Sequence, residues 1–95
     1  MIGIYKITNL INNKSYVGQS IHIERRWQEH CQSSSNCLIG KAIQKYGKQN
    51  FSFQIIEEVE DISLLNDLEA KYIKYFNSLA PNGYNIILID SNEHH

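Results

Sequence analysis

The first twenty positions carry two short apolar runs separated by polar residues, a pattern that predicts a β-hairpin. Residues 2–8 are rich in β-branched and aromatic side chains, which favour strands. Asn12-Asn13-Lys14 predicts a turn, because asparagine tolerates the left-handed backbone conformation. Residues 15–19 then predict the returning strand.

Apolar spacing after the hairpin predicts two helices joined by a polar loop. The first helix is expected over residues 22–32, with Ser20 as the cap at its start. The second is expected over residues 37–46 and ends before Gly47, a residue type common just past helix ends. The loop between them, residues 32–36, is entirely polar.

The second half of the chain begins with a predicted strand over residues 51–57. Phe51, Phe53 and Ile55 alternate there with polar residues, so these three side chains should share one buried face. A third helix follows, for which Asp61 is the expected cap.

This third helix is expected to run to Phe76 or Asn77. Pro81-Asn82-Gly83 predicts a turn, and residues 84–89 predict a short extended return. The resulting order, ββααβαβ, predicts a small α/β domain with a largely antiparallel sheet covered by helices.

Length and composition indicate one domain. The chain has 95 residues, of which 42% are hydrophobic, enough for a single core. We expect residues 1–90 to form the domain and treat residues 91–95 as a tail, for which an expression tag is one interpretation. No apolar run approaches the roughly 20 residues that span a bilayer, and no signal-peptide pattern is present. With only two cysteines, an intracellular, reducing setting is expected.

Charge is divided unevenly along the chain. The net charge is −1, but residues 1–50 hold seven Lys and Arg against two acidic residues, whereas residues 51–95 hold two against eight. Such a chain could present a basic face to phosphates, or its charges could mix in three dimensions and cancel. Lys41, Lys45 and Lys48 form a basic stripe, which is either a solvated face or a contact for a nucleic-acid backbone.

One carboxylate falls in or beside the apolar stripe of the third predicted helix. Glu69 follows Leu65 by four positions and precedes Ile73 by four. A carboxylate there is unfavourable unless it meets a cation or metal, although a glutamate at the edge of a stripe also reaches water. The full stripe is Ile62, Leu65, Leu68, Tyr72, Ile73 and Phe76.

Arg26 and His30 lie four positions apart on the first predicted helix and therefore share a face, beside an apolar ridge. The planar guanidinium of Arg26 suits phosphate oxygens, although a surface arginine beside a packed histidine would give the same pattern. Arg25 should point elsewhere, toward Glu29, as an ordinary surface pair.

Two tyrosines stand beside glycines on the predicted hairpin. Tyr16 shares a strand face with Gly18, and Tyr5 shares one with Gly3. Each glycine should leave open space beside a ring. The ordinary alternative is a pair of core aromatics with their hydroxyls at the rim of the sheet.

Four further side chains raise the question of a zinc site: His22, His30, Cys31 and Cys37. Their spacing fits no common zinc pattern, and neighbours on a helix cannot easily point at one ion. We therefore expect no zinc there.

These features occur together, in one order, in a known family. The chain resembles the GIY-YIG nuclease superfamily over residues 2–87, and five ordered elements make the resemblance specific. The elements are Gly3-Ile4-Tyr5, Tyr16-Val17-Gly18, Arg26-x-x-x-His30, a helical Glu69 and Asn82-Gly83-Tyr84-Asn85.

The resemblance implies a three-stranded antiparallel sheet flanked by three or more helices, and metal-dependent cleavage of DNA. The catalytic positions that it implies are Tyr5, Tyr16, Arg26, His30, Glu69 and Asn85. The DNA-binding positions that we expect around them are Lys14, Arg25, Lys41, Lys45 and Lys48.

The details of the motif are most similar to phage and intron-encoded homing enzymes. Gln19-Ser20 follows Gly18, where the excision-repair members have lysine, and the Thr-Gly start of the junction nucleases is missing. Val17 stands where the family name has Ile, and the residues after Asn85 are less glycine-rich than expected. The linker and recognition module of homing enzymes are absent, so a stand-alone enzyme or a catalytic fragment is expected.

The chemistry implied is hydrolysis assisted by one metal. Glu69 would hold one Mg²⁺ or Mn²⁺, and Arg26 would neutralise the scissile phosphate. Tyr5 would be the base and Tyr16 the phosphate-orienting group, although the reverse is nearly as plausible. His30 would relay a proton or hold a tyrosine hydroxyl. Asn85 would orient Glu69 or a backbone turn.

Several alternatives remain at this point. One is a DNA-binding module that has kept the fold and lost catalysis, another a DNA-repair or restriction nuclease, and a third a plain structural or interaction domain. A near-neutral domain should bind DNA weakly, so a separate DNA-recognition domain is an expected partner. The expected state is a monomer or weak dimer that nicks one strand per active site, without membrane association.

Overall fold

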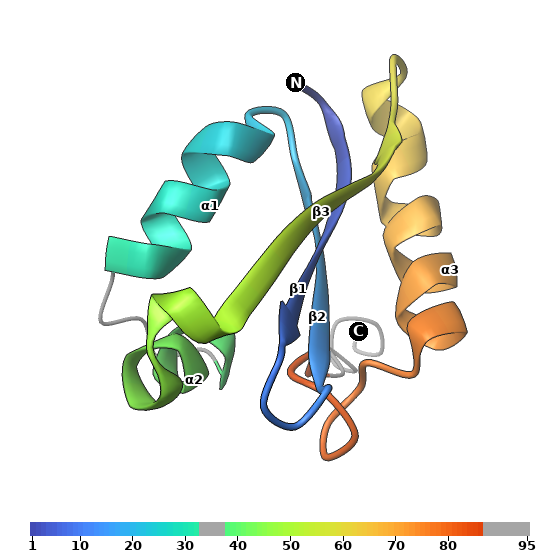
Figure 1. Cartoon of the computed structure of the whole chain (residues 1–95). Coiled ribbons are helices and arrows are strands. Elements are labelled where there is room, and N and C mark those ends of the chain that lie inside the picture. The colour runs from blue at the N-terminus through green and yellow to red at the C-terminus, as the bar shows by residue number, and fades with distance from the viewer. Residues whose placement is uncertain (33–37, 87–95) are drawn as a thin grey trace, which may run out of the picture.

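The structure, a computed structural model, describes residues 1–32 and 38–86 and places a three-stranded sheet between two helical layers (Figure 1). This is the predicted antiparallel sheet with helices. The strands are β1 (Gly3–Asn9), β2 (Ser15–Ser20) and β3 (Phe51–Glu58). The α-helices are α1 (Ile23–Gln32), α2 (Leu38–Tyr46) and α3 (Leu65–Phe76), with short 3₁₀ turns η1 (Lys48–Asn50) and η2 (Ile62–Leu64).

The predicted hairpin forms the centre of the fold. Strand β1 lies between its hairpin partner β2 and the later β3, in the order β2-β1-β3. Asn13 adopts the left-handed conformation with φ 64°, and Asn12 Oδ1 accepts a hydrogen bond of 2.9 Å from the Lys14 N–H. The turn prediction is therefore confirmed, and β2 is left as an edge strand.

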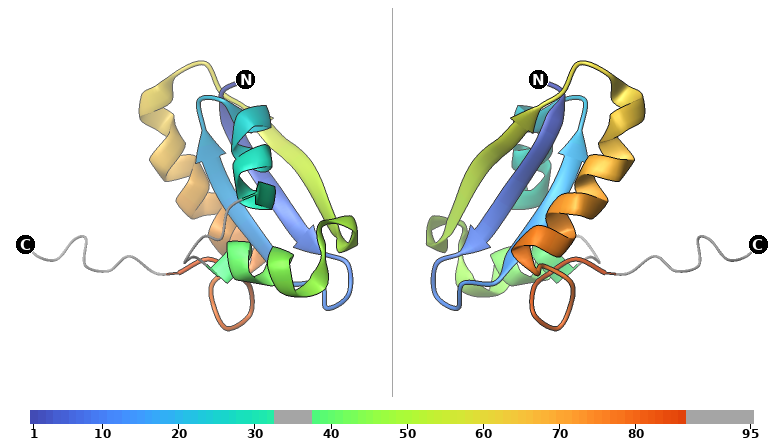
Figure 2. Two further views of the ribbon diagram at one scale, coloured as in Figure 1. Left: turned by 90° about the vertical axis from the view of Figure 1, so that its left-hand side faces the viewer. Right: turned by 90° about the vertical axis from the view of Figure 1, so that its right-hand side faces the viewer.

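Alternation along β1 produces two cores, one on each face of the sheet. Tyr5 and Ile7 point toward α1 and α2, whereas Ile4 points toward α3 together with Val17 of β2. The two side views place α1 and α2 on one side of the sheet and α3 on the other (Figure 2). Because β1 is covered on both faces, the side chains it carries are held firmly.

The prediction that Ile55 belongs to the core is wrong. Its side chain is 43% exposed, although Phe51 and Phe53 on the same predicted face are covered. The register shifts between β1 and β3, so Tyr5 pairs with Ile55 while Ile4 pairs with Glu57. Ile56, which the shift leaves without a partner in the register, is partly buried against the core cluster under α3, on the face opposite to Ile55.

The helix starts also differ from the prediction. The Asp61 carboxylate accepts a 3.0 Å hydrogen bond from the Ser63 N–H and caps η2, so α3 begins only at Leu65. Ile62 lies on that turn and is 57% exposed, so it does not belong to the buried stripe. Ser20, the predicted cap of the first helix, also lies before its helix, since α1 begins at Ile23. Its Oγ accepts a hydrogen bond of 2.9 Å from the backbone N–H of His22.

The predicted helix ends are confirmed. Helix α2 ends at Tyr46, and Gly47 follows with φ 91°. Helix α3 ends at Phe76, and Asn77 closes it in the left-handed conformation with φ 54°. None of the helices in residues 1–32 and 38–86 is both long and apolar enough to cross a membrane.

The segment after α3 returns to the open edge of β2 without forming a full strand. Over its described part it makes a single bridge between Leu79 and Asn85. The side-chain amide of buried Asn85 pairs with both backbone groups of Val17, accepting from its N–H at 2.8 Å and donating to its carbonyl at 2.9 Å. Residues 87–89 of the predicted return and the tail 91–95 lie outside the described residues.

Replacing this amide should destabilise the domain. Asn85→Ala removes both bonds to Val17 and the 2.6 Å bond from Ser78 Oγ, leaving buried polar groups without partners. We expect a loss of roughly 2–4 kcal/mol in the free energy of unfolding, measured by urea denaturation. The matched control is Asn82→Ala, which removes an exposed bond of 3.4 Å to Asn77. An Asn85→Ala variant as stable as this control would contradict the assignment.

Candidate active site

Tyr5 and Gly18 pack against each other across the hairpin. Tyr5 is fully buried and lies opposite Gly18 in the register. A Cβ atom at Gly18 would fall on the phenol ring of Tyr5, so the expected open space is filled by that ring. Gly3 is not beside open space either, because a Cβ there would meet the backbone of Glu57. The glycines therefore serve close packing rather than a cavity.

Tyr5 also interacts with Tyr16 and Arg26. The centroids of the two tyrosine rings are 6.3 Å apart. Burial raises the pKa of Tyr5 well above the usual phenol range, neighbouring Tyr16 raises it further, and hydrogen bonding and charge from Arg26 lower it only in part. In the free protein, Tyr5 is therefore a neutral phenol at physiological pH.

Glu69 lies half-buried on α3, facing β2. Its Oε1 accepts a 3.1 Å hydrogen bond from Gln19 Nε2. Burial raises the pKa of the Glu69 carboxyl, and the hydrogen bond from Gln19 opposes this only in part. Together with Tyr16 and Asn85, Glu69 lines a cavity of about 660 Å³. The stripe-edge position predicted for this carboxylate is confirmed.

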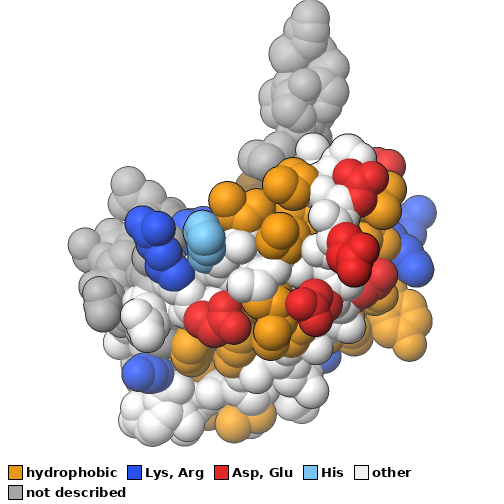
Figure 3. Space-filling model, turned by 90° about the horizontal axis from the view of Figure 1, so that it is seen from above, with side chains coloured by type: hydrophobic (Ala, Val, Ile, Leu, Met, Phe, Trp, Pro, Cys, Tyr) orange, Lys and Arg blue, Asp and Glu red, His pale blue; other side chains and the backbone are white. Residues whose placement is uncertain are grey.

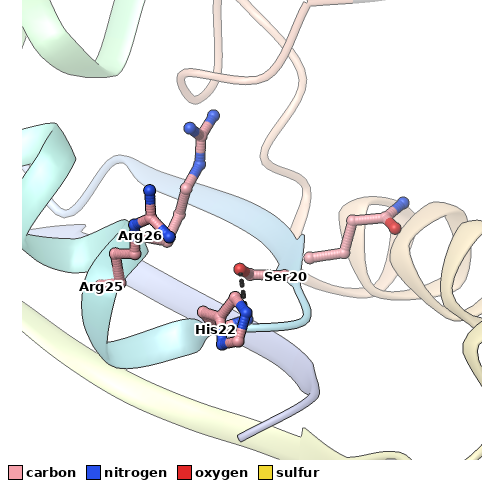
Figure 4. A pocket seen from close by; sticks show the side chains of 5 residues that line it. Ser20, His22, Arg25 and Arg26 are labelled. Atoms are coloured by element: carbon pink, nitrogen blue, oxygen red, sulfur yellow. Dashed lines mark hydrogen bonds between the residues drawn. The ribbon is translucent and has the colours of Figure 1, made fainter.

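A second cavity, of about 310 Å³, lies at the start of α1 and gathers cationic side chains (Figure 4). Arg25 and Arg26 both line it, together with His22 and Ser20. The predicted pairing of Arg25 with Glu29 stays a prediction, because the side chain of Glu29 lies outside the described residues.

Positive and negative side chains are partly separated on the face that Figure 3 shows. Seen from above, basic side chains and a histidine gather over α1, whereas most of the acidic side chains lie toward α3 (Figure 3). The charges separated along the sequence thus remain partly separated in space. This arrangement suits a phosphate over α1 and a cation near α3.

The remaining predicted positions are less central. His30 lies on α1, but its side chain is outside the described residues. Asn85 bonds the backbone of Val17 within strand β2, rather than Glu69 or a turn as predicted. None of the four lysines predicted to bind DNA lines either cavity; they are Lys14, Lys41, Lys45 and Lys48.

Two polar side chains that the motif analysis did not assign help to build the site. Gln19 bonds Glu69 and also lines the arginine cavity. Tyr84 accepts a 2.9 Å hydrogen bond at its hydroxyl from Asn9 Nδ2 and so fastens the last described segment to the hairpin. The sequence offered only position as a signal, since Gln19 follows Gly18 directly and Tyr84 precedes Asn85.

The donor set fits a single hard cation. Residues 1–32 and 38–86 contain no group of three or more His, Cys, Asp or Glu that could hold a metal between them. Of the described residues that line the two cavities, Glu69 is the one that offers a carboxylate. Mg²⁺ and Mn²⁺ accept such a site, because Mg²⁺ in particular keeps several waters when one or two carboxylates bind it.

Comparisons with known proteins agree with this geometry. Residues 1–85 match the GIY-YIG catalytic domain family. Intron-associated endonuclease 1 of Enterobacteria phage T4 is 38% identical over 88% of this chain, and probable intron-encoded endonuclease 1 of Neurospora crassa is 40% identical over 79%. The matched regions span 36% and 27% of those two relatives.

A solved structure has the same fold. It is the catalytic domain of intron endonuclease I-TevI, in a mutant with alanine in place of a glutamate. The TM-score is 0.80 at 34% identity, and the match covers 90% of this chain and 93% of that one.

The buried charge of Glu69 should reduce stability at neutral pH. Because its folded-state pKa lies above the usual 4.5, the unfolded chain releases this proton first, and stability falls as pH rises through that window. We therefore expect Glu69→Gln to unfold at a higher temperature than the wild type at pH 7 in the presence of a chelator.

The gain in melting temperature should shrink as the pH falls through the raised pKa of Glu69, since both proteins are then uncharged at position 69. Asp67→Asn, at an exposed position of α3, is the matched control and should give no such gain. A Glu69→Gln variant less stable than the wild type at neutral pH would contradict the sign.

Proposed function

This chain belongs to the GIY-YIG catalytic domain family, and we propose that it is an endonuclease that hydrolyses phosphodiester bonds in DNA with one divalent metal. The observation that carries the proposal is that Glu69 lines one cavity and Arg26 lines the other. Glu69 supplies a carboxylate for a cation, and Arg26 supplies a guanidinium for a phosphate.

The arginine cavity would receive the scissile phosphate. Its lining by Arg25, Arg26 and His22 supports this, because guanidinium groups bind phosphate oxygens through paired hydrogen bonds. Arg26 would offset the negative charge that grows on the phosphoryl oxygens during attack. Arg25 would contact the DNA backbone beside it.

The tyrosines would divide the remaining work. Tyr16 is half-buried and lines the cavity beside Glu69, whereas Tyr5 is fully buried. This difference favours Tyr16 as the general base: in its phenolate form it would accept a proton from the attacking water and become a neutral phenol, with Tyr5 holding Tyr16 and Arg26 in place. A bound Mg²⁺ or Mn²⁺ would supply Lewis acidity and lower the pKa of water. His30 remains a candidate proton relay.

The biological setting that we propose is that of a homing-type or phage mobile-element enzyme acting inside the host cell. The two intron-related relatives described above support this class. Since the chain matches only about a third of their length, a separate DNA-recognition domain is a reasonable partner. One glutamate at one site favours a monomer or weak dimer that nicks one strand at a time.

A nicking assay tests the central proposal. With Mg²⁺, supercoiled plasmid should convert to the open-circular form, and a chelator should stop the conversion. Glu69→Ala and Arg26→Ala should each lower the rate by at least about 100-fold while far-UV circular dichroism is unchanged. Asp67→Ala, on the exposed surface of α3, is the matched control and should cut normally. Full activity in either site variant would refute the assignment, and DNA retention without cutting by the wild type would favour an inactive binding module.

The role of Arg25 can be separated from catalysis by salt dependence. In a Glu69→Gln background, Arg25→Ala should weaken DNA binding and reduce the slope of log affinity against log salt by about 1. Lys71→Ala on α3, where the lysine lies 5.2 Å from the Tyr72 ring, serves as the control of equal charge change. An unchanged slope for Arg25→Ala would exclude a phosphate contact.

A further inference from the structure

The side-chain amide of Gln19 joins the edge strand to α3. Its Nε2 donates to Asn66 Oδ1 at 2.7 Å and to Glu69 Oε1 at 3.1 Å. The two acceptors are three residues apart on α3 and therefore share a helix face. A primary amide nitrogen carries two protons, so both are engaged in this link.

Within the described part of the chain, this amide is the side-chain donor that binds the Glu69 carboxylate. A glutamate side chain has several rotamers, and a hydrogen bond from a fixed donor selects among them. Oε1 accepts this bond with one of its lone pairs, so Oε2 has the greater capacity left for a cation or its waters. Gln19 thus favours one orientation of the carboxylate.

Gln19 also belongs to the other half of the site. It lines the arginine cavity with Arg25 and Arg26, and it lies three residues after Tyr16 on the same strand. The charged groups of the two cavities are therefore connected through one neutral side chain. Any shift of α3 against β2 would change the distance between the carboxylate and the arginines.

We propose that Gln19 is a positioning residue, which holds the Glu69 carboxylate in the orientation that binds the divalent metal. This inference rests on the proposed function for the identity of the metal-dependent reaction. Asn66 accepts the second N–H of the amide in an exposed hydrogen bond, and the metal itself would contact Glu69. Hydrogen-bonding partners of metal ligands commonly change metal affinity or activity by about 10–100-fold when removed.

The test compares Gln19→Met with Asn66→Ala in the whole chain. Methionine keeps the length of the side chain and removes the donor, whereas Asn66→Ala keeps the bond between Gln19 and Glu69. Mn²⁺ binding is measured without DNA by electron paramagnetic resonance, and nicking gives kcat and KM separately. For Gln19→Met we expect Mn²⁺ binding and kcat to fall by about 10-fold each, with KM for DNA within about 2-fold. For Asn66→Ala we expect changes below about 3-fold in both.

Two results would overturn the proposal. One is wild-type Mn²⁺ affinity in Gln19→Met, including the case in which only its melting temperature falls, since that would leave Gln19 a purely structural role. The second result comes from the wild type and decides the matter if Gln19→Met does not fold. The side-chain amide signals of Gln19 should shift in nuclear magnetic resonance spectra on addition of Mg²⁺, and unchanged signals would refute the role.

The proposed function can fail separately. A wild type that binds Mn²⁺ without cutting DNA would refute the nuclease assignment, while the Mn²⁺ affinities of the two variants would still decide the role of Gln19. A wild type that does not bind Mn²⁺ would overturn both.

Discussion

The close contact between the Tyr5 ring and the backbone of Gly18 is the constraint on which the rest of the site depends. It fixes the register of β1 against β2, and a side chain at Gly18 would displace the ring. With the ring in place, its hydroxyl end meets Tyr16 and Arg26. The motif that identifies the family is therefore first a packing motif, and the chemistry is arranged around it.

The cationic and the anionic groups of the site lie at two different cavities. Arg26 and Glu69 line different cavities, and Gln19 separates and connects them. The neutral amide of Gln19 bonds the half-buried Glu69 carboxylate without neutralising its charge, so the carboxylate stays anionic at some expense of stability.

Patterns that depend on local chemistry were predictable from the sequence. The hairpin followed from Asn13, and the position of Glu69 followed from the helical repeat. The exposure of Ile55 was not predictable, because the burial of a strand face depends on which elements pack over it. Gln19 was missed for a related reason: its surroundings are set by how β2, α1 and α3 meet, which no local spacing encodes.

The bonds of Asn85 to Val17 have a consequence for association. Exposed backbone groups on an edge strand are a template for pairing with another extended chain, a common route to aggregation. At Val17 both groups are already bound by a side chain, and the Ser15 carbonyl accepts from the Tyr84 N–H at 2.8 Å. The strand that carries Tyr16 is thus closed to β-augmentation at these points, so the segment after α3 protects it from pairing with a second extended chain.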